Sequence, residues 1–291
     1  MLDLTKRLDH LTGLRGIAAY TVLIGHAIDA AMATSIPHAV AGMAVQLAYF
    51  GMSAFFVLSG FVIHYNYLDT FKSNSFIEAC RLFFIARFAR LYPLYALTIV
   101  LNFFFVPAIF FGRPGALAAY VTMTASWFNL EKLIYPPGWS ISSEWFFYFV
   151  FALIAPIVSR SRANPRWLLL TLFVGVPIFF LFINSLSASV YPFLETLFFH
   201  DQAASAPIDV WLWYYAPYVR IMEFFFGMLA SAIYLRSGSK LALLSVAGSV
   251  LEVVAIGWCV GVIFIGGAFT ATPFGPLSSN FTFAPPLSPS L

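Results

Sequence analysis

Seven stretches of this 291-residue chain are long and apolar enough to cross a lipid bilayer as helices. A spanning helix needs about 20 mainly apolar residues, because its backbone polar groups must be satisfied without water. The candidates are residues 16–34, 45–65, 91–111, 140–158, 167–186, 219–235 and 241–269. A shorter apolar stretch at 190–199 is expected to be re-entrant or interfacial. The pattern predicts an all-α fold, a polytopic helical bundle in a membrane.

The composition excludes other broad classes. Charged residues make up 9% of the chain and hydrophobic residues 61%. A soluble domain carries about 25% charged residues, and a disordered chain combines low hydrophobicity with high charge. The basic residues form no solvated patch with stacking aromatics, so no nucleic-acid partner is expected. Cys80 and Cys259 fit no metal-binding or redox spacing, so no metal is expected.

The positions of Lys and Arg predict the orientation, because cytoplasmic loops carry an excess of positive charge. With the N-terminus in the cytoplasm, twelve of the fifteen Lys and Arg residues fall on the inner side. The outer loop at 187–217 has no Lys or Arg but three acidic residues. We therefore expect a multi-pass membrane protein with a cytoplasmic N-terminus. That end lacks a small-residue cleavage site, so the first span is expected to stay attached.

Ionisable residues within the spans are functional candidates, because charge is costly to bury in lipid. Arg15 and His26 are eleven residues apart, which is about three helical turns and places both on one helix face. The helical rise between them is roughly 16 Å, which predicts Arg15 at the cytoplasmic rim and His26 near mid-membrane. Alternatively, Arg15 reaches for lipid headgroups and His26 is satisfied by a neighbouring helix.

Arg81, Arg87 and Arg90 precede the third apolar segment. The spacing of Arg87 and Arg90 predicts that they share one face of a helix end. Guanidinium groups donate forked hydrogen bonds, so the three arginines suit a phosphate or carboxylate at the cytoplasmic side. Anchoring by the positive-inside rule explains the same location without a ligand.

Glu144 lies two turns into a segment rich in Phe, Trp and Tyr. A carboxyl group there suits a general acid or base, or a partner for a cationic imidazole. The segment is predicted to enter from the outer face, so Glu144 approaches mid-depth from outside. The alternative is a structural carboxyl group held by hydrogen bonds.

Two further features predict helix packing rather than chemistry. Small residues interrupt the second span and let helices approach closely; they are Gly51, Ser53, Ser59 and Gly60. Neither serine lies in the G-x-S-x-G turn of a serine nucleophile. Arg220 and Glu223 are three residues apart, which predicts an ion pair on one helix face.

Five segments occur in the order typical of one enzyme family. They read LTGLRGIAAYTVLIGH, GMSAFFVLSGFVI, RFARLYPLY, WSISSEWFFY and RIMEFFFGM, and they extend from Leu11 to Met228, about three quarters of the chain. Together they make the sequence resemble membrane-bound acyltransferase family 3. That family is known for O-acetylating surface polysaccharides, lipopolysaccharide, exported glycans and some antibiotics. The combination is specific, although an Arg and a His separated by ten residues is a weak signal alone.

The resemblance implies an acyl-CoA donor, usually acetyl-CoA, that enters from the cytoplasm. It also implies an acceptor hydroxyl on a glycan or lipid-linked glycan, and a place in the bacterial inner membrane. By their positions in the motifs, Arg15, Arg87 and Arg90 are predicted to bind the donor. The extended pantetheine arm would then bridge the helix rise to His26.

Carried over by position, His26 matches the family's essential histidine and Glu144 its glutamate, which makes them the predicted catalytic residues. His26 would act as general base on the acceptor hydroxyl or as a transient acyl carrier. Glu144 would orient or charge-balance the imidazole, or serve as the base itself. The residues do not choose between these routes. Trp139, Ser142 and Tyr148 are predicted to contact the substrate.

Members of that family usually have more spans than the seven predicted here, which suggests a shortened member. Residues 1–272 would form the transmembrane acyltransferase domain and residues 273–291 a disordered, Pro/Ser-rich tail. Two other classes stay open. A proton-coupled transporter of a small anionic or acylated substrate would use the intramembrane His and Glu as a relay. A scaffold that holds glycan enzymes would need none of these residues.

Overall fold

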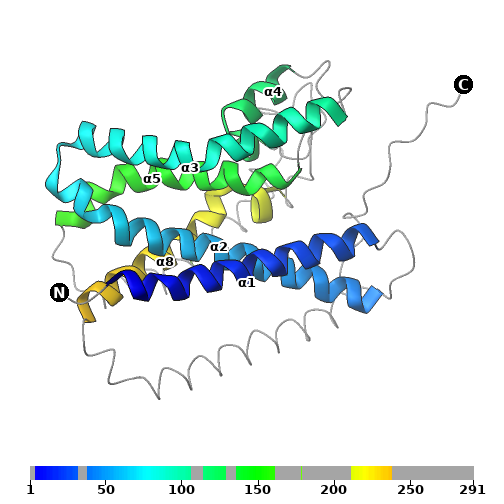
Figure 1. Ribbon diagram of the computed structural model, residues 1–291, viewed down its shortest axis with the longest axis horizontal. Helices are drawn as coiled ribbons and strands as arrows, with labels where there is room; N and C mark the ends of the chain where they lie inside the picture. Colours follow the sequence, from blue (N-terminus) through cyan, green and yellow to red (C-terminus); the bar gives the residue numbers. More distant parts are fainter. Residues whose placement is uncertain are drawn as a thin grey trace, which may run out of the picture. The chain divides into compact units, whose positions relative to one another are not determined.

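The described part of the protein is entirely helical. The computed structural model describes residues 4–31, 38–105, 114–128, 136–160, 178 and 211–237. Among these residues, four helices are long and apolar enough to cross a membrane: Leu47–Ser73, Phe76–Phe105, Trp139–Val158 and Pro217–Leu235. The described residues (Figure 1) therefore have the helices of a membrane bundle, as the apolar pattern predicts.

Several predicted features lie outside the described residues. They are the spans at 167–186 and 241–269, the apolar stretch at 190–199 and the tail at 273–291. The predicted span at 16–34 corresponds to helix α1 (Leu4–Ala31), whose apolar part extends from Gly13 to Ile28. The number of spans and the orientation of the N-terminus stay predictions.

The chain divides into two compact units, residues 1–55 with 237–291 and residues 56–236. In the first unit, α1 packs against the beginning of α2 (His38–Ser73). A β-carbon at Gly51 would lie 2.8 Å from the carbonyl oxygen of Ala18, so only glycine allows this approach of the two helices. The packing role predicted for Gly51 is confirmed.

Helix α3 (Phe76–Phe105) begins well before the predicted third span, which starts at residue 91. The hydroxyl of Ser75 accepts a hydrogen bond of 3.4 Å from the backbone N–H of Glu78 and caps the first turn. Ser-x-x-Glu before an apolar run is a helix-start signal. Arg87 and Arg90 therefore lie inside α3, and the prediction that they occupy a helix end is wrong.

The second unit is built around α5 (Trp139–Arg160), which lies beside α3 (Figure 1). Aromatic rings pack between α2, α3 and α5 around the fully buried Phe83. Its ring lies 5.0 Å from Tyr67 of α2 and 5.8 Å from Tyr148 of α5, both edge to face. Aromatic pairs in this geometry stabilise the packing beyond the area that they bury. The three helices are therefore held together at the level of these rings.

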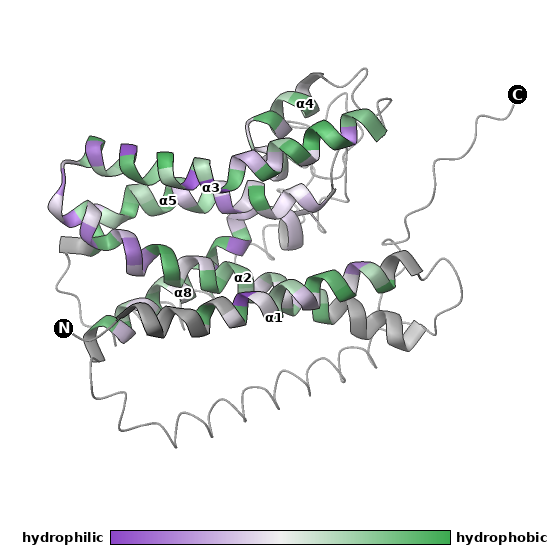
Figure 2. Ribbon diagram, viewed as in Figure 1, coloured by the Kyte–Doolittle hydropathy of each residue, from purple (hydrophilic) through white to green (hydrophobic). Residues whose placement is uncertain are grey.

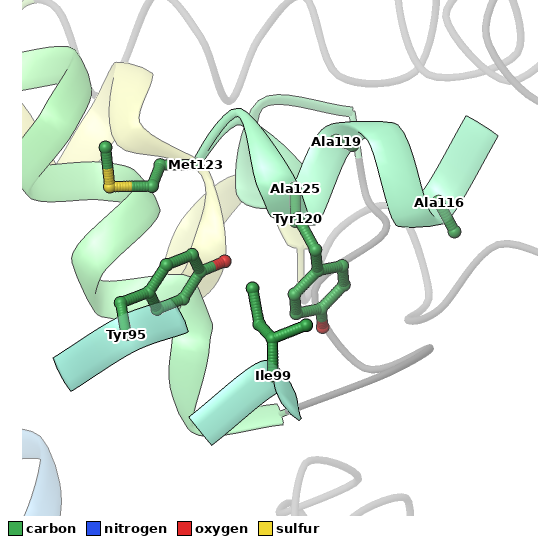
Figure 3. Packing of buried hydrophobic residues seen from close by; sticks show 7 residues of the cluster. All are labelled: Tyr95, Ile99, Ala116, Ala119, Tyr120, Met123 and Ala125. Atoms are coloured by element: carbon green, nitrogen blue, oxygen red, sulfur yellow. The ribbon is translucent and has the colours of Figure 1, made fainter. Parts of the chain in front are cut away.

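A smaller apolar cluster joins α4 (Pro114–Val121) to α3. Figure 3 shows its members: Tyr95, Ile99, Ala116, Ala119, Tyr120, Met123 and Ala125. Met123 has φ of 56°, in the left-handed region where helices commonly end. The chain turns there into the short helix η3 (Ala125–Phe128), which packs against α5.

Helix α8 (Pro217–Ser237) crosses α2 at two glycines. A β-carbon at Gly60 would overlap the α8 backbone carbonyl of Phe224, and one at Gly227 would overlap the α2 carbonyl of Val57. Because neither position has room for a side chain, the two backbones are in direct contact. The packing role predicted for Gly60 is confirmed.

Much of the outer surface of α3 is apolar. Leu94, Phe104 and Phe105 are 68%, 73% and 81% exposed. Figure 2 shows much of this helix in the hydrophobic colours. A soluble protein rarely leaves so large an apolar surface uncovered, whereas lipid tails cover it at little cost. The surface therefore supports a membrane environment for α3.

Candidate functional site

The carboxylate of Glu144 is held from two helices. The hydroxyl of Ser59, on α2, donates a hydrogen bond of 2.6 Å to Oε1. The phenol of Tyr148, one turn further along α5, donates a hydrogen bond of 2.9 Å to Oε2. Both donors are buried, and the carboxylate itself is half-buried. Among the described residues, each oxygen thus has one donor and keeps a further lone pair for another hydrogen bond.

Arg87 is fixed by a tyrosine of α2. Its Nη2 donates a hydrogen bond of 2.6 Å to the hydroxyl of Tyr67, and its guanidinium carbon lies 4.7 Å from the centre of the same ring. Arg90 is exposed on the same helix. Tyr67 packs edge to face on Phe83, and Phe83 packs in the same way on Tyr148, the phenol that binds Glu144. Arg87 and the carboxylate are therefore connected through these three rings within the second unit.

Trp139, the first residue of α5, is buried in an aromatic cluster. Its ring centre lies 5.9 Å from that of Phe56, 4.9 Å from that of Tyr214 and 5.2 Å from that of Tyr215. The two tyrosines belong to the π-helical turn η5 (Trp211–Tyr215), which precedes α8. The cluster therefore joins α2, α5 and η5 at the start of α5. Trp139 precedes Glu144 by five residues on this helix.

Ser142 belongs to a buried cluster of hydroxyl groups. Its Oγ accepts hydrogen bonds from the backbone N–H of Ser126, at 3.1 Å, and from the Ser126 hydroxyl, at 2.9 Å. The neighbouring Ser143 donates to the carbonyl of Tyr215 at 3.1 Å, and Trp211 Nε1 donates to the carbonyl of Ser126 at 2.8 Å. These bonds tie η3 and η5 to α5. A contact between Ser142 and substrate stays a prediction.

Arg15 and His26 lie on α1, in the first unit. The helix continues through both positions, so the spacing of about three turns is realised. Arg15 is half-buried and His26 is exposed. Glu144, Arg87 and Arg90 belong to the second unit. That the residues of α1 act together with Glu144 and the α3 arginines in one reaction stays a prediction.

A family model, described as an acyltransferase domain, matches residues 8–288. The chain belongs to this acyltransferase family. The resemblance seen in the sequence motifs is therefore confirmed. The match includes the helices that carry Arg15, His26, Arg87, Arg90 and Glu144.

One curated relative of this family member is acyltransferase MdmB of Streptomyces mycarofaciens. The two are 28% identical over 253 residues, which is 80% of this chain and 58% of the relative. The chain thus spans less than two thirds of that protein's length. No solved structure matches the chain significantly.

Two residues of this site make polar contacts that the sequence pattern does not predict. Ser59 was assigned to helix packing, yet its hydroxyl binds the candidate catalytic carboxylate. Tyr67 carried no predicted role, yet it binds Arg87. The contact of Tyr67 with Arg87 is visible only in the structure, because it joins two helices. Ser59, by contrast, lies in the FFVLSGF motif, where a polar residue within a large apolar run needs a buried partner.

Proposed function

We propose that this chain transfers an acyl group, acetyl as the first candidate, from acyl-CoA to a hydroxyl of a glycan or other exported acceptor in the bacterial inner membrane. The observation that carries the proposal is the Glu144 carboxylate, held by Ser59 and Tyr148 in the same compact unit as Arg87 and Arg90. An anion-binding pair and a positioned carboxylate are the parts that acyl transfer from a phosphorylated donor requires. Membership of the acyltransferase family supports the same reaction class.

In the proposed reaction, Arg87 and Arg90, together with Arg15, bind the phosphates of the donor. The Tyr67 hydroxyl accepts from Nη2 of Arg87, while Nε has no hydrogen-bond partner among the described residues, so the guanidinium is oriented and keeps a further donor. Arginine is suited to this task because its planar fork matches phosphate oxygens. Trp139 and Tyr148 contribute to the acceptor side.

The proposed chemistry replaces one acyl bond by another. The acceptor oxygen forms a bond to the acyl carbon, the carbon–sulfur bond of the thioester breaks, and CoA leaves as a thiol. The acceptor proton passes to His26 or Glu144 and finally to the CoA sulfur. In the covalent variant of this route, the imidazole of His26 carries the acyl group between two transfers. A carboxylate held at both oxygens is already oriented for proton transfer or for balancing an imidazolium.

The direct test supplies acyl-labelled acetyl-CoA to membrane vesicles that contain the full chain, with a cell-envelope glycan fraction as acceptor. We expect label covalently attached to the glycan, released as acetate by mild alkali. Vesicles without the protein are the control. Movement of label across the membrane without covalent transfer would favour the transporter, and no label in either form would contradict both activities.

Arg87→Ala is expected to raise the KM for acetyl-CoA by roughly tenfold to a hundredfold, because a charge-assisted hydrogen bond to a phosphate is lost. The value of kcat should change much less, because the proposal assigns Arg87 to the phosphates of the donor and not to the reacting bond. Arg81→Ala is the matched control, since Arg81 is exposed on the same helix but lies outside the RFARLYPLY motif that assigns Arg87 and Arg90 to the donor. Initial rates measured against acetyl-CoA concentration give both KM and kcat for each variant. An unchanged donor KM in Arg87→Ala would contradict the phosphate role.

A further inference from the structure

Arg220 is buried among aromatic rings with one edge of its guanidinium unused. It lies in the first turn of α8, and its side chain is 11% exposed. Its Nη1 forms an ion pair of 3.0 Å with Oε1 of Glu223. The guanidinium carbon lies 5.2 Å from the centre of the Phe56 ring and 5.5 Å from that of the Tyr214 ring. Glu223 and the two rings thus fix the plane of the guanidinium, and the predicted ion pair is confirmed.

Two donors of this group, Nε and Nη2, are buried and have no hydrogen-bond partner in the part of the chain that the structure describes. They are the two nitrogens of one edge of the guanidinium, so their N–H bonds point in the same direction. Leaving two such donors unsatisfied is costly, and buried polar groups are almost always paired. An oriented edge with two empty donors is therefore suited to a ligand that presents two oxygens side by side.

The surroundings specify the chemistry of that ligand. Glu223 already balances the charge of Arg220, so the site offers hydrogen bonds without a net positive charge. An anionic ligand would gain less here, because the Glu223 carboxylate lies beside the guanidinium, whereas two neighbouring hydroxyl groups carry no charge to be repelled. Tyr214 is half-buried and can contact the apolar C–H groups of a sugar ring, while the buried Phe56 helps to hold the guanidinium in place. Trp139 extends this set, because its ring contacts those of Phe56 and Tyr214.

The position relative to Glu144 fits an acceptor. Phe56, which stacks on Arg220, lies one helical turn before Ser59 on α2, a rise of about 4.5 Å. Ser59 in turn donates to the Glu144 carboxylate. Phe56 and Ser59 thus connect Arg220 with the Glu144 carboxylate through neighbouring positions of α2. We propose that Arg220 and the aromatic set Phe56, Trp139 and Tyr214 bind a neutral glycosyl unit of the acceptor through two adjacent hydroxyl groups. The assignment of this unit as the acceptor rests on the proposed function.

Binding is tested with the full chain in lipid nanodiscs and a panel of neutral methyl hexosides of gluco, galacto, manno and rhamno configuration. Methyl glucuronide serves as the anionic comparison. Saturation-transfer NMR should detect at least one neutral glycoside, bound more tightly than the glucuronide. Arg220→Met should weaken that affinity by roughly tenfold or more, because both oxygens lose their donors. Arg81→Met, a change of the same kind at an exposed position, should leave it unchanged.

Arg220→Lys separates ligand binding from a structural role. Lysine keeps the positive charge for Glu223, so the thermal unfolding midpoint should stay close to that of the wild type. An ammonium group cannot present two parallel donors, so the glycoside affinity should still fall. Full affinity in Arg220→Lys, no binding by any neutral glycoside, or tighter binding of the glucuronide would overturn the proposal.

The acyl transfer assay keeps this proposal separate from the proposed function. If the wild type transfers label but Arg220→Met keeps the acceptor KM, the sugar site is wrong and the reaction stands. If no label is transferred but glycoside binding depends on Arg220, the reaction is wrong and the sugar site stands.

Discussion

Glu144→Gln is expected to lower acyl transfer by at least about a hundredfold, the lower end of what a positioned acid or base contributes. The substitution removes the ionisable group and changes little else. The amide oxygen of glutamine still accepts the hydrogen bond from Ser59, which is 2.6 Å long with the native carboxylate. The protein should therefore fold, and donor binding through the arginines of α3 should persist. Steady-state transfer of labelled acetyl to glycan measures the loss.

The hydrogen-bond donors of Glu144 provide graded controls. Ser59→Ala and Tyr148→Phe each remove one donor and leave the carboxylate in place. We expect losses of about tenfold or less, since each costs the orientation supplied by one hydrogen bond. If Glu144→Gln kept wild-type turnover, the carboxylate would be structural. If all three variants lost turnover equally and the amount of folded protein fell with it, the hydrogen bonds would serve only to pack the helices.

The order and type of the elements could be predicted from the sequence to a large degree, because long apolar runs in lipid leave few alternatives to helices. Gly51 and Gly60 were identified as contact positions, since the reason for a small residue is local to its helix. The start of α3 was missed because charged residues between 76 and 90 lower the hydropathy of a helix that nevertheless continues. The Ser75–Glu78 capping pattern was the available signal, and the apolar criterion does not detect it.

The site was predictable in its residues but not in its contacts. Glu144 stands out in the sequence because a carboxylate in an apolar segment needs a reason. Its partner Ser59 is 85 residues away, and only the packing of α2 on α5 brings them together. The same holds for Tyr67 and Arg87, which are 20 residues apart on consecutive helices. Long-range pairs of this kind depend on helix rotation and register, which short apolar patterns leave undetermined.

The unused edge of Arg220 illustrates a different limit. The spacing of Arg220 and Glu223 predicts their ion pair, and the structure confirms it. A pair identified in this way looks complete, because the two charges balance. Only the atoms show that one edge of the guanidinium remains without a partner among the described residues. Sequence patterns identify which groups meet, but they do not count the hydrogen bonds that each group still has to make.

His26→Ala is expected to abolish acyl transfer to within the sensitivity of the assay if the imidazole carries the acyl group. If it acts as a general base, the loss should be about a hundredfold to ten-thousandfold. The side chain is exposed on α1, so its removal leaves no cavity and the protein should stay folded. Donor binding should also persist, because the phosphate-binding role belongs to the arginines. A loss of turnover with an unchanged donor affinity is therefore the expected signature.

The two routes for His26 are separated by rapid quenching of the wild-type protein with labelled acetyl-CoA in the absence of acceptor. Label that becomes attached to the protein, and that is missing in His26→Ala, supports the covalent carrier. No label on an active protein supports the base. His64→Asn is the control, since His64 is a buried histidine whose Nδ1 lies 3.0 Å from the hydroxyl of Ser231. Its loss should lower thermal stability while the folded fraction keeps its turnover. Full transfer by His26→Ala would remove this histidine from the reaction and leave Glu144 as the remaining candidate base.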